Sequence, residues 1–146
     1  MIYQKGSAKG FTLIEVLVVI GLIAILASVV IVAINPARQF AQARNSQRIS
    51  NVETIMSALG QDLAEHKGVS TCTGVNSSTS SIGTSGVDLS GCLEPYISSG
   101  IPMDPSTGTA ADTGYQISVA AGRFTICAPG YAESALGIST HYCLRR

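Results

Sequence analysis

The side chains that could do chemistry are few and scattered along this chain of 146 residues. Nucleophilic catalysis needs a nucleophile held beside a base. The two histidines, His66 and His141, come with no Gly-x-Ser-x-Gly, His-Glu-x-x-His or phosphate-loop sequence. The sequence therefore predicts that the protein is not an enzyme.

One short segment offers candidate ligands for a cation. Asp104, Ser106 and Asp112 could supply oxygen atoms to calcium. Pro105 follows the first of these residues, however, and Asp-Pro turns are common without a metal. The sequence therefore predicts no cofactor and leaves calcium near Asp104 and Asp112 as an alternative only.

Three arginines, Arg123, Arg145 and Arg146, could form a patch that contacts the phosphates of a nucleic acid. No aromatic stacking partners accompany them. With 9 basic and 9 acidic residues, the chain also has no net charge to attract a polyanion. We therefore expect no nucleic-acid partner.

The four cysteines, Cys72, Cys92, Cys127 and Cys143, show no Cys-x-x-Cys spacing. Their spacing argues against zinc and against a thioredoxin-like site. It favours disulfides, which persist in a chain that leaves the cytoplasm. Four cysteines allow three pairings, and their number alone does not choose among them.

The first element that positions these residues is a long apolar segment. Residues 11–34 contain a single charged residue, Glu15, and at about 1.5 Å per residue they can cross a bilayer core of roughly 30 Å. Lys5 and Lys9 precede this segment, so the positive-inside rule keeps residues 1–10 in the cytoplasm and sends the rest outward. No small-residue site for an ordinary signal peptidase follows it.

The boundary between leader and apolar segment reads Lys9-Gly10 followed by Phe11-Thr12-Leu13-Ile14-Glu15-Val16. It resembles the leader and first helical turn of type IV pilins and of the pseudopilins of type II secretion, and the resemblance extends over residues 5–50. The resemblance implies that a prepilin peptidase cuts between Gly10 and Phe11. It also implies that the new amine of Phe11 is N-methylated and that the apolar helix is retained for assembly.

Glu15 supports the same interpretation on physical grounds. A carboxylate within an apolar span costs on the order of 2.5 kcal/mol or more near the bilayer centre and usually has a partner, yet no basic residue lies within one helical turn. The cut would create an ammonium group at Phe11. In a stack of parallel helices, that group could meet Glu15 of a neighbouring subunit and set the register. The alternative is that Glu15 snorkels to the cytoplasmic interface.

A second helical segment is expected beyond the apolar one. Pro36 should kink or interrupt the helix, which then resumes from Ala37 to Lys67 and ends at Gly68. Apolar residues recur in its second half at spacings of three and four, and charged residues fall mainly elsewhere. The expected apolar stripe is Phe40, Ala41, Ile49, Val52, Ile55, Met56, Leu59 and Leu63, and the charged residues are Arg38, Arg44, Arg48, Glu53, Asp62 and Glu65.

The remaining residues predict a small antiparallel sheet. Residues 73–91 are dominated by Ser, Thr and Gly and should form a long surface loop. Alternating apolar residues over 115–128, interrupted at Gly122, predict a hairpin, and a similar pattern over 138–144 predicts a last strand. The predicted fold class is α+β and pilin-like, with a long N-terminal helix whose second half packs against a small antiparallel sheet.

This order of elements favours one disulfide pairing. Cys72 and Cys92 bracket the 73–91 loop, while Cys127 and Cys143 lie on the second and third strand candidates. We therefore expect the bonds Cys72–Cys92 and Cys127–Cys143.

The chain is thus expected to comprise a cytoplasmic leader (1–10), a transmembrane assembly helix (11–34) and an extracytoplasmic head (35–146). The resemblance implies a single-pass precursor in the inner membrane. Its partners would be the peptidase, the inner-membrane assembly machinery and further copies of itself in a helical filament.

Two kinds of filament fit the resemblance. The C-terminal disulfide resembles that of pilins and favours an extracellular type IV pilus used for adhesion, twitching motility or DNA uptake. The Asp104-Pro105 element favours a periplasmic pseudopilus of type II secretion. A third alternative from a different class is an uncut, monomeric binding domain anchored by residues 11–34.

Overall fold

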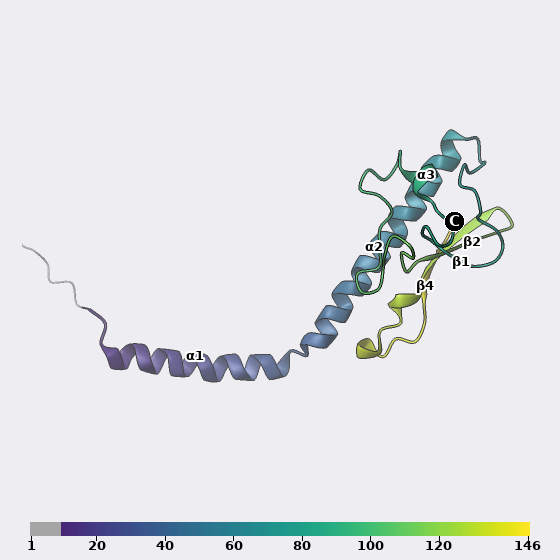
Figure 1. Cartoon of the computed structure of the whole chain (residues 1–146). Coiled ribbons are helices and arrows are strands. Elements are labelled where there is room, and N and C mark those ends of the chain that lie inside the picture. Colours follow the sequence, from purple (N-terminus) through teal and green to yellow (C-terminus); the bar gives the residue numbers. More distant parts are fainter. Residues whose placement is uncertain (1–9) are drawn as a thin grey trace, which may run out of the picture. The chain divides into compact units, whose positions relative to one another are not determined.

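The structure is a computed structural model that describes residues 10–146 (Figure 1). Lys5 and Lys9, the basic residues of the predicted leader, lie outside the described residues. The chain divides into two compact units between Pro36 and Ala37. Each unit is described by itself.

The first unit contains helix α1, Leu13–Ala33, which has 21 residues. Thr12 caps its N-terminus, and none of its residues is buried. Among the described residues, α1 is the one helix long and apolar enough to cross a membrane. The position of the predicted apolar helix is therefore confirmed.

Helix α2, Pro36–Glu65, begins after a short break at Ile34 and Asn35. The predicted interruption is confirmed, and Pro36 occupies the first turn of the new helix, where no backbone N–H is needed. At the other end, the N–H of Gly68 donates to the carbonyl of Leu63 at 2.7 Å. Lys67 and Gly68 both have positive φ, 57° and 87°. The helix thus ends at Glu65, two residues before the predicted Lys67, because Lys67 is already in the left-handed region.

The buried face of α2 differs from the predicted apolar stripe. Arg48 and Asp62, which were expected outside the stripe, are 1% and 0% exposed, whereas Phe40 is 66% exposed. The reason is geometric, because the face that contacts the head advances in steps of three and four residues that include both charged positions. The buried residues of α2 are Ala41, Asn45, Arg48, Asn51, Val52, Ile55, Met56, Ala58, Leu59 and Asp62.

The sheet has four antiparallel strands in the order β1-β2-β3-β4. The strands are β1 (Ser80–Ser81), β2 (Gln116–Ala120), β3 (Arg123–Ala128) and β4 (Tyr142–Arg145). The predicted hairpin is β2–β3, closed by Ala121 and Gly122 with φ of 51° and 71°. Two positive φ values suit the two-residue turn that matches the twist of paired strands.

Two segments depart from the predicted head. The 73–91 segment is not only a surface loop, because it contains β1 and buries Ile82, Val87 and Leu89 in the core. The last strand begins at Tyr142 rather than at Ile138, since two 3-10 turns, Pro129–Tyr131 and Ser134–Leu136, occupy the chain before it. A short helix, α3 (Ser90–Leu93), lies between β1 and β2 in the sequence.

One cluster of buried apolar side chains joins α2 to the sheet and to the 82–97 segment. Disulfides join Cys72 to Cys92 and Cys127 to Cys143. The second bond links directly opposite residues of β3 and β4. The fold is therefore the α+β, pilin-like arrangement expected from the sequence, with one strand more.

Candidate functional site

The N-terminal end of α1 holds the residues expected to act in processing and assembly. Phe11 is 83% exposed, and no atom crowds the position that a Cβ on Gly10 would occupy. The Thr12 hydroxyl oxygen accepts a hydrogen bond from the N–H of Glu15 at 3.3 Å. Thr12 and Glu15 have the spacing of a capping box. This local role was not predicted, although the Thr-x-x-Glu pattern signals it.

The Glu15 carboxylate, in contrast, has no partner in the described part of the chain. Within residues 10–146 it forms no hydrogen bond or ion pair. It borders an apolar hollow of about 340 Å³ on the surface of α1, lined by Phe11, Glu15, Val16, Val19 and Ile20. An acidic group in the first turn is favourable for the helix dipole. That interaction does not replace a direct cationic partner in an apolar medium.

The head contains a second charged site, centred on Arg48. Its guanidinium donates to Asp104 Oδ2 at 2.5 Å, to Glu133 Oε1 at 2.7 Å and to Ser106 Oγ at 2.7 Å. The same group donates to Asn45 Oδ1 at 2.8 Å. The Arg48 and Asp104 side chains are each 1% exposed. This charge cluster therefore ties α2 to two distant segments of the head.

A second arginine completes the charge cluster at its edge. Arg44 donates to both carboxylate oxygens of Glu133 at 2.7 and 2.8 Å. Hydrogen bonds from Arg44 and Arg48 lower the pKa of Glu133 to about 2. Burial alone would raise the pKa of Asp104, but hydrogen bonds from Arg48 and Ser106 hold it well below its usual range. Both carboxylates are therefore ionised at neutral pH.

The charge cluster leaves no room for a side chain at Gly130. A Cβ at this position would lie 2.8 Å from Asp104 Oδ2 and 3.1 Å from Arg48 Nε. Real Cβ atoms are essentially never found as close as the first of these distances. The backbone after β3 therefore passes directly against the buried ion pair.

The oxygen atoms considered for calcium are engaged by the protein itself. Asp104 and Ser106 bind Arg48, and Asp112 accepts from the N–H of Gly114 at 2.9 Å. No group of three or more His, Cys, Asp or Glu residues that could hold a metal occurs within residues 10–146. The cation of the charge cluster is thus the guanidinium of Arg48.

Asp62 and the two histidines lie outside the charge cluster. Asp62 accepts hydrogen bonds from Ser70 and Thr71 and so fixes the chain after α2. His66 Nδ1 lies 3.1 Å from Asp62 Oδ1. His141 is exposed just before β4.

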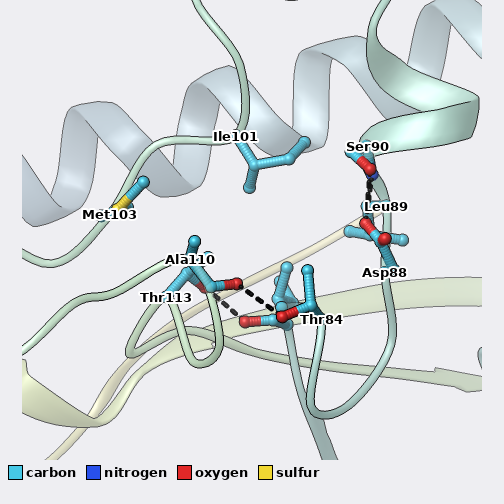
Figure 2. Close-up of a pocket in the computed structure, with 10 residues that line it drawn as sticks. Thr84, Asp88, Leu89, Ser90, Ile101, Met103, Ala110 and Thr113 are labelled. Carbon is cyan, nitrogen blue, oxygen red and sulfur yellow. Dashed lines mark hydrogen bonds between the residues drawn. The ribbon is translucent and has the colours of Figure 1, made fainter.

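The head also has a small pocket between the 82–90 and 101–113 segments (Figure 2). It encloses about 150 Å³ and is lined mainly by apolar side chains, including Ile82, Leu89 and Ile101. Asp88 and Ser90 hydrogen-bond to each other at its border. No histidine, lysine or cysteine is among the residues that line the pocket.

The N-terminal segment matches a known family. Residues 5–31 match the prokaryotic N-terminal methylation motif, which is the prepilin signal of type IV pilins and pseudopilins. This motif is typical of the N-terminal segment of type IV pilins and pseudopilins, and the match covers that segment of the chain alone. It implies processing by a prepilin peptidase and filament assembly in a membrane machinery. No curated protein and no solved structure shows significant similarity to the chain.

Proposed function

We propose that the chain is the precursor of a type IV pilus subunit, cut between Gly10 and Phe11 and N-methylated on Phe11. The proposal is carried by one observation: the Glu15 carboxylate has no partner among residues 10–146, and it lies on a helix with no buried residue, four residues after the exposed Phe11. A charge in such a place needs a partner from outside the described chain.

The cut supplies that partner. Hydrolysis between Gly10 and Phe11 leaves an ammonium group at Phe11, one helical turn from Glu15. In a staggered stack of parallel copies, this amine binds Glu15 of a neighbour and fixes the register of the filament. The apolar surface of α1 faces lipid in the inner-membrane precursor and the helices of other copies after assembly.

The head is the part displayed outside the cytoplasm. Its two disulfides suit an oxidising compartment. Its charge cluster joins the segments that contain Asp104 and Glu133 to α2. In a pilus, the homo-oligomeric filament extends from the cell and serves adhesion, twitching motility or DNA uptake. The Cys127–Cys143 bond near the C-terminus favours this assignment.

A pseudopilin of type II secretion is the second candidate. The Asp104-Pro105 element favours it, because this segment resembles the one that precedes the sheet in many pseudopilins. In this protein, Arg48 neutralises the aspartate. The two candidates share the cut, the methylation and the assembly helix, and differ in where the filament lies.

Intact-mass measurement after membrane extraction tests the shared part. We expect a chain that begins at Phe11 and carries one added methyl group, and a full-length chain when the prepilin peptidase is absent. A chain that begins at Met1 in the presence of the peptidase would contradict the proposal. That result would favour a monomeric binding domain anchored by residues 11–34.

Sheared extracellular filaments from intact cells then separate the two candidates. A pilin is recovered in the sheared fraction, whereas a periplasmic pseudopilin stays with the cells until the outer membrane is opened.

A further inference from the structure

Three exposed basic side chains lie at one end of the β3–β4 pair. Arg123 begins β3, Arg145 pairs with Thr125 in the sheet register, and the N–H of Arg146 donates to the carbonyl of Phe124 at 3.0 Å. All three arginines are exposed, and within residues 10–146 none of them forms an ion pair. We call Arg123, Arg145 and Arg146 the arginine edge.

Strand alternation places two of these arginines on the outer face of the sheet. Phe124 and Ile126 of β3 are buried in the core, so the residues between them point the other way. Arg123 and Arg145 therefore project away from the core, at diagonal positions of neighbouring strands. β4 is also a terminal strand of the sheet, which leaves this edge open.

Acidic side chains gather around α3 on a different part of the head. Asp88 precedes α3 and Glu94 follows it, while the Tyr96 hydroxyl donates to Glu65 at the end of α2 at 2.8 Å. The three carboxylates are exposed and form no ion pair among the described residues. We call Glu65, Asp88 and Glu94 the acidic edge. Lys67 lies close in sequence to Glu65 and carries the opposite charge, but the three carboxylates leave the acidic edge with a net negative charge.

The topology keeps the two edges of one head apart. The arginine edge lies on β3 and β4, at one side of the sheet. The acidic edge adjoins the other side, because Asp88 directly follows the bridge between Ile82 and Val87 beside β1. In contrast, Arg44 and Arg48 find their carboxylates inside the same head.

We propose that the arginine edge of one copy binds the acidic edge of the next copy in the filament. The proposal rests on the proposed function, because it needs neighbouring heads. A contact between two different surfaces of the same protein is head-to-tail, and it generates an open helical filament when the rotation between copies does not close into a ring. Arginine suits this contact because its planar fork pairs with carboxylates through two hydrogen bonds.

Charge reversal in the full-length chain tests the contact in cells that assemble filaments from it. One variant combines Arg123→Glu, Arg145→Glu and Arg146→Glu, and a second combines Glu65→Arg, Asp88→Arg and Glu94→Arg. A third variant carries all six changes. A matched control, Arg123→Lys with Arg145→Lys, keeps the sign of the charge.

We expect each reversed edge to lower the yield of sheared filaments roughly tenfold or more, because like charges then meet. The six-fold variant should restore the yield to within about threefold of the original, and the lysine control should change it little. Equal membrane levels and intact disulfides on non-reducing gels show that the variants fold.

Three outcomes would overturn the contact. If the variants with a reversed edge assemble normally, the arginines only prevent aggregation through the exposed edge strand, and glutamates would do this equally well. If either reversed edge lowers the filament yield but the variant with all six changes does not restore it, the arginine edge binds another acidic partner, such as a nucleic acid or a different protein. A cross-link pattern confined to single chains would exclude neighbouring copies. If the original chain forms no filaments, the proposed function fails instead.

Zero-length cross-linking shows whether the two edges of neighbouring copies are in contact. In filaments of the Arg145→Lys variant, a carbodiimide joins the new amine to a carboxylate in contact with it. Filaments assembled from a mixture of ¹⁴N- and ¹⁵N-labelled chains show whether the joined peptides come from different copies. We expect mixed-label peptides that join position 145 to Glu94, Asp88 or Glu65.

Discussion

Helices α1 and α2 differ in whether their charged side chains have partners within the described chain. In α1 the Glu15 carboxylate is the only charge, no residue is buried, and no partner lies within the described chain. In α2 the buried charges Arg48 and Asp62 are fully hydrogen-bonded, and no buried side-chain N or O atom within residues 10–146 lacks a partner. A charge satisfied inside the chain serves the fold of the head, whereas an unsatisfied one indicates a contact with another molecule.

The largest expected effect breaks the α1 side of this comparison. Glu15→Val should leave the precursor cut and inserted, because it keeps α1 apolar, but should block incorporation into filaments by removing the partner of the Phe11 amine. Ser28→Ala is the control, since it removes another polar side chain of α1, whose hydroxyl donates to the Ile25 carbonyl within the same helix. The measurement is sheared-filament yield with each variant as sole subunit. Normal filaments from Glu15→Val would refute the register argument.

Reduction of both disulfides should give the next largest effect. The bonds span 20 and 16 residues of sequence, and loops of this size contribute about 3 kcal/mol each. We expect the head of the detergent-solubilised chain to lose several kcal/mol of unfolding free energy on reduction, as measured by circular dichroism. Peptide mapping without reductant should recover the two observed pairs. Free thiols, or stability indifferent to reductant, would contradict an extracytoplasmic head.

Arg48→Met tests the α2 side directly. The change leaves the Asp104 carboxylate buried without its cation, and breaking a buried pair costs about 3–5 kcal/mol. Arg123→Met is the matched control, because the exposed arginine lacks an ion pair within residues 10–146 and its loss should change stability by no more than about 0.5 kcal/mol. Chemical unfolding of the two variants makes the comparison. Similar losses in both would mean that the buried pair contributes little.

Glu133 should give a smaller effect that depends on pH. Its pKa is lowered from 4.5 to about 2 in the folded head. The group therefore stabilises the fold fully above its unfolded pKa, and this contribution is lost as the pH falls from 4.5 towards 2. The stability difference between the original chain and Glu133→Gln should shrink across that window. A stability difference that does not change with pH would assign the effect of the substitution to packing alone. Glu53→Gln, on the exposed side of α2, is the control.

Deletion of residues 1–34 should have the smallest effect on the head. The core, both disulfides and the charge cluster all lie beyond the deleted segment. We expect a soluble monomer by analytical ultracentrifugation, with unfolding equal to that of the head in the full chain. A head that aggregates or unfolds would show that α1 contributes to its stability.

Much of the fold follows from local patterns in the sequence. The apolar run over 11–34 specifies α1, Pro36 specifies the break, and alternation around Gly122 specifies the hairpin. β1 was not predicted because its two serines carry no alternation of their own. They pair with β2 only because Ile82 and Val87 anchor the segment in the core.

The charge cluster was harder to predict than the residues proposed for processing and assembly. Gly10, Phe11 and Glu15 lie within one stretch of six residues, so their pattern is visible without a structure. Arg48 contacts residues 56 and 85 positions away. Arg48 precedes Val52 and Ile55 at helical spacings of four and three, so it lies on the same face of α2 as these core residues. This was the available signal, since a charge on a core face implies a buried partner.

Gly130 gives the charge cluster an evolutionary consequence. Any side chain there would collide with Asp104 and Arg48, so the glycine is required only while the buried ion pair is present. Replacement of the pair by smaller apolar residues would make room for Ala at position 130, whereas the same alanine in the present head would displace the aspartate. Mutations at positions 48, 104 and 130 should therefore be epistatic, and the order in which they arise should decide whether the intermediates fold.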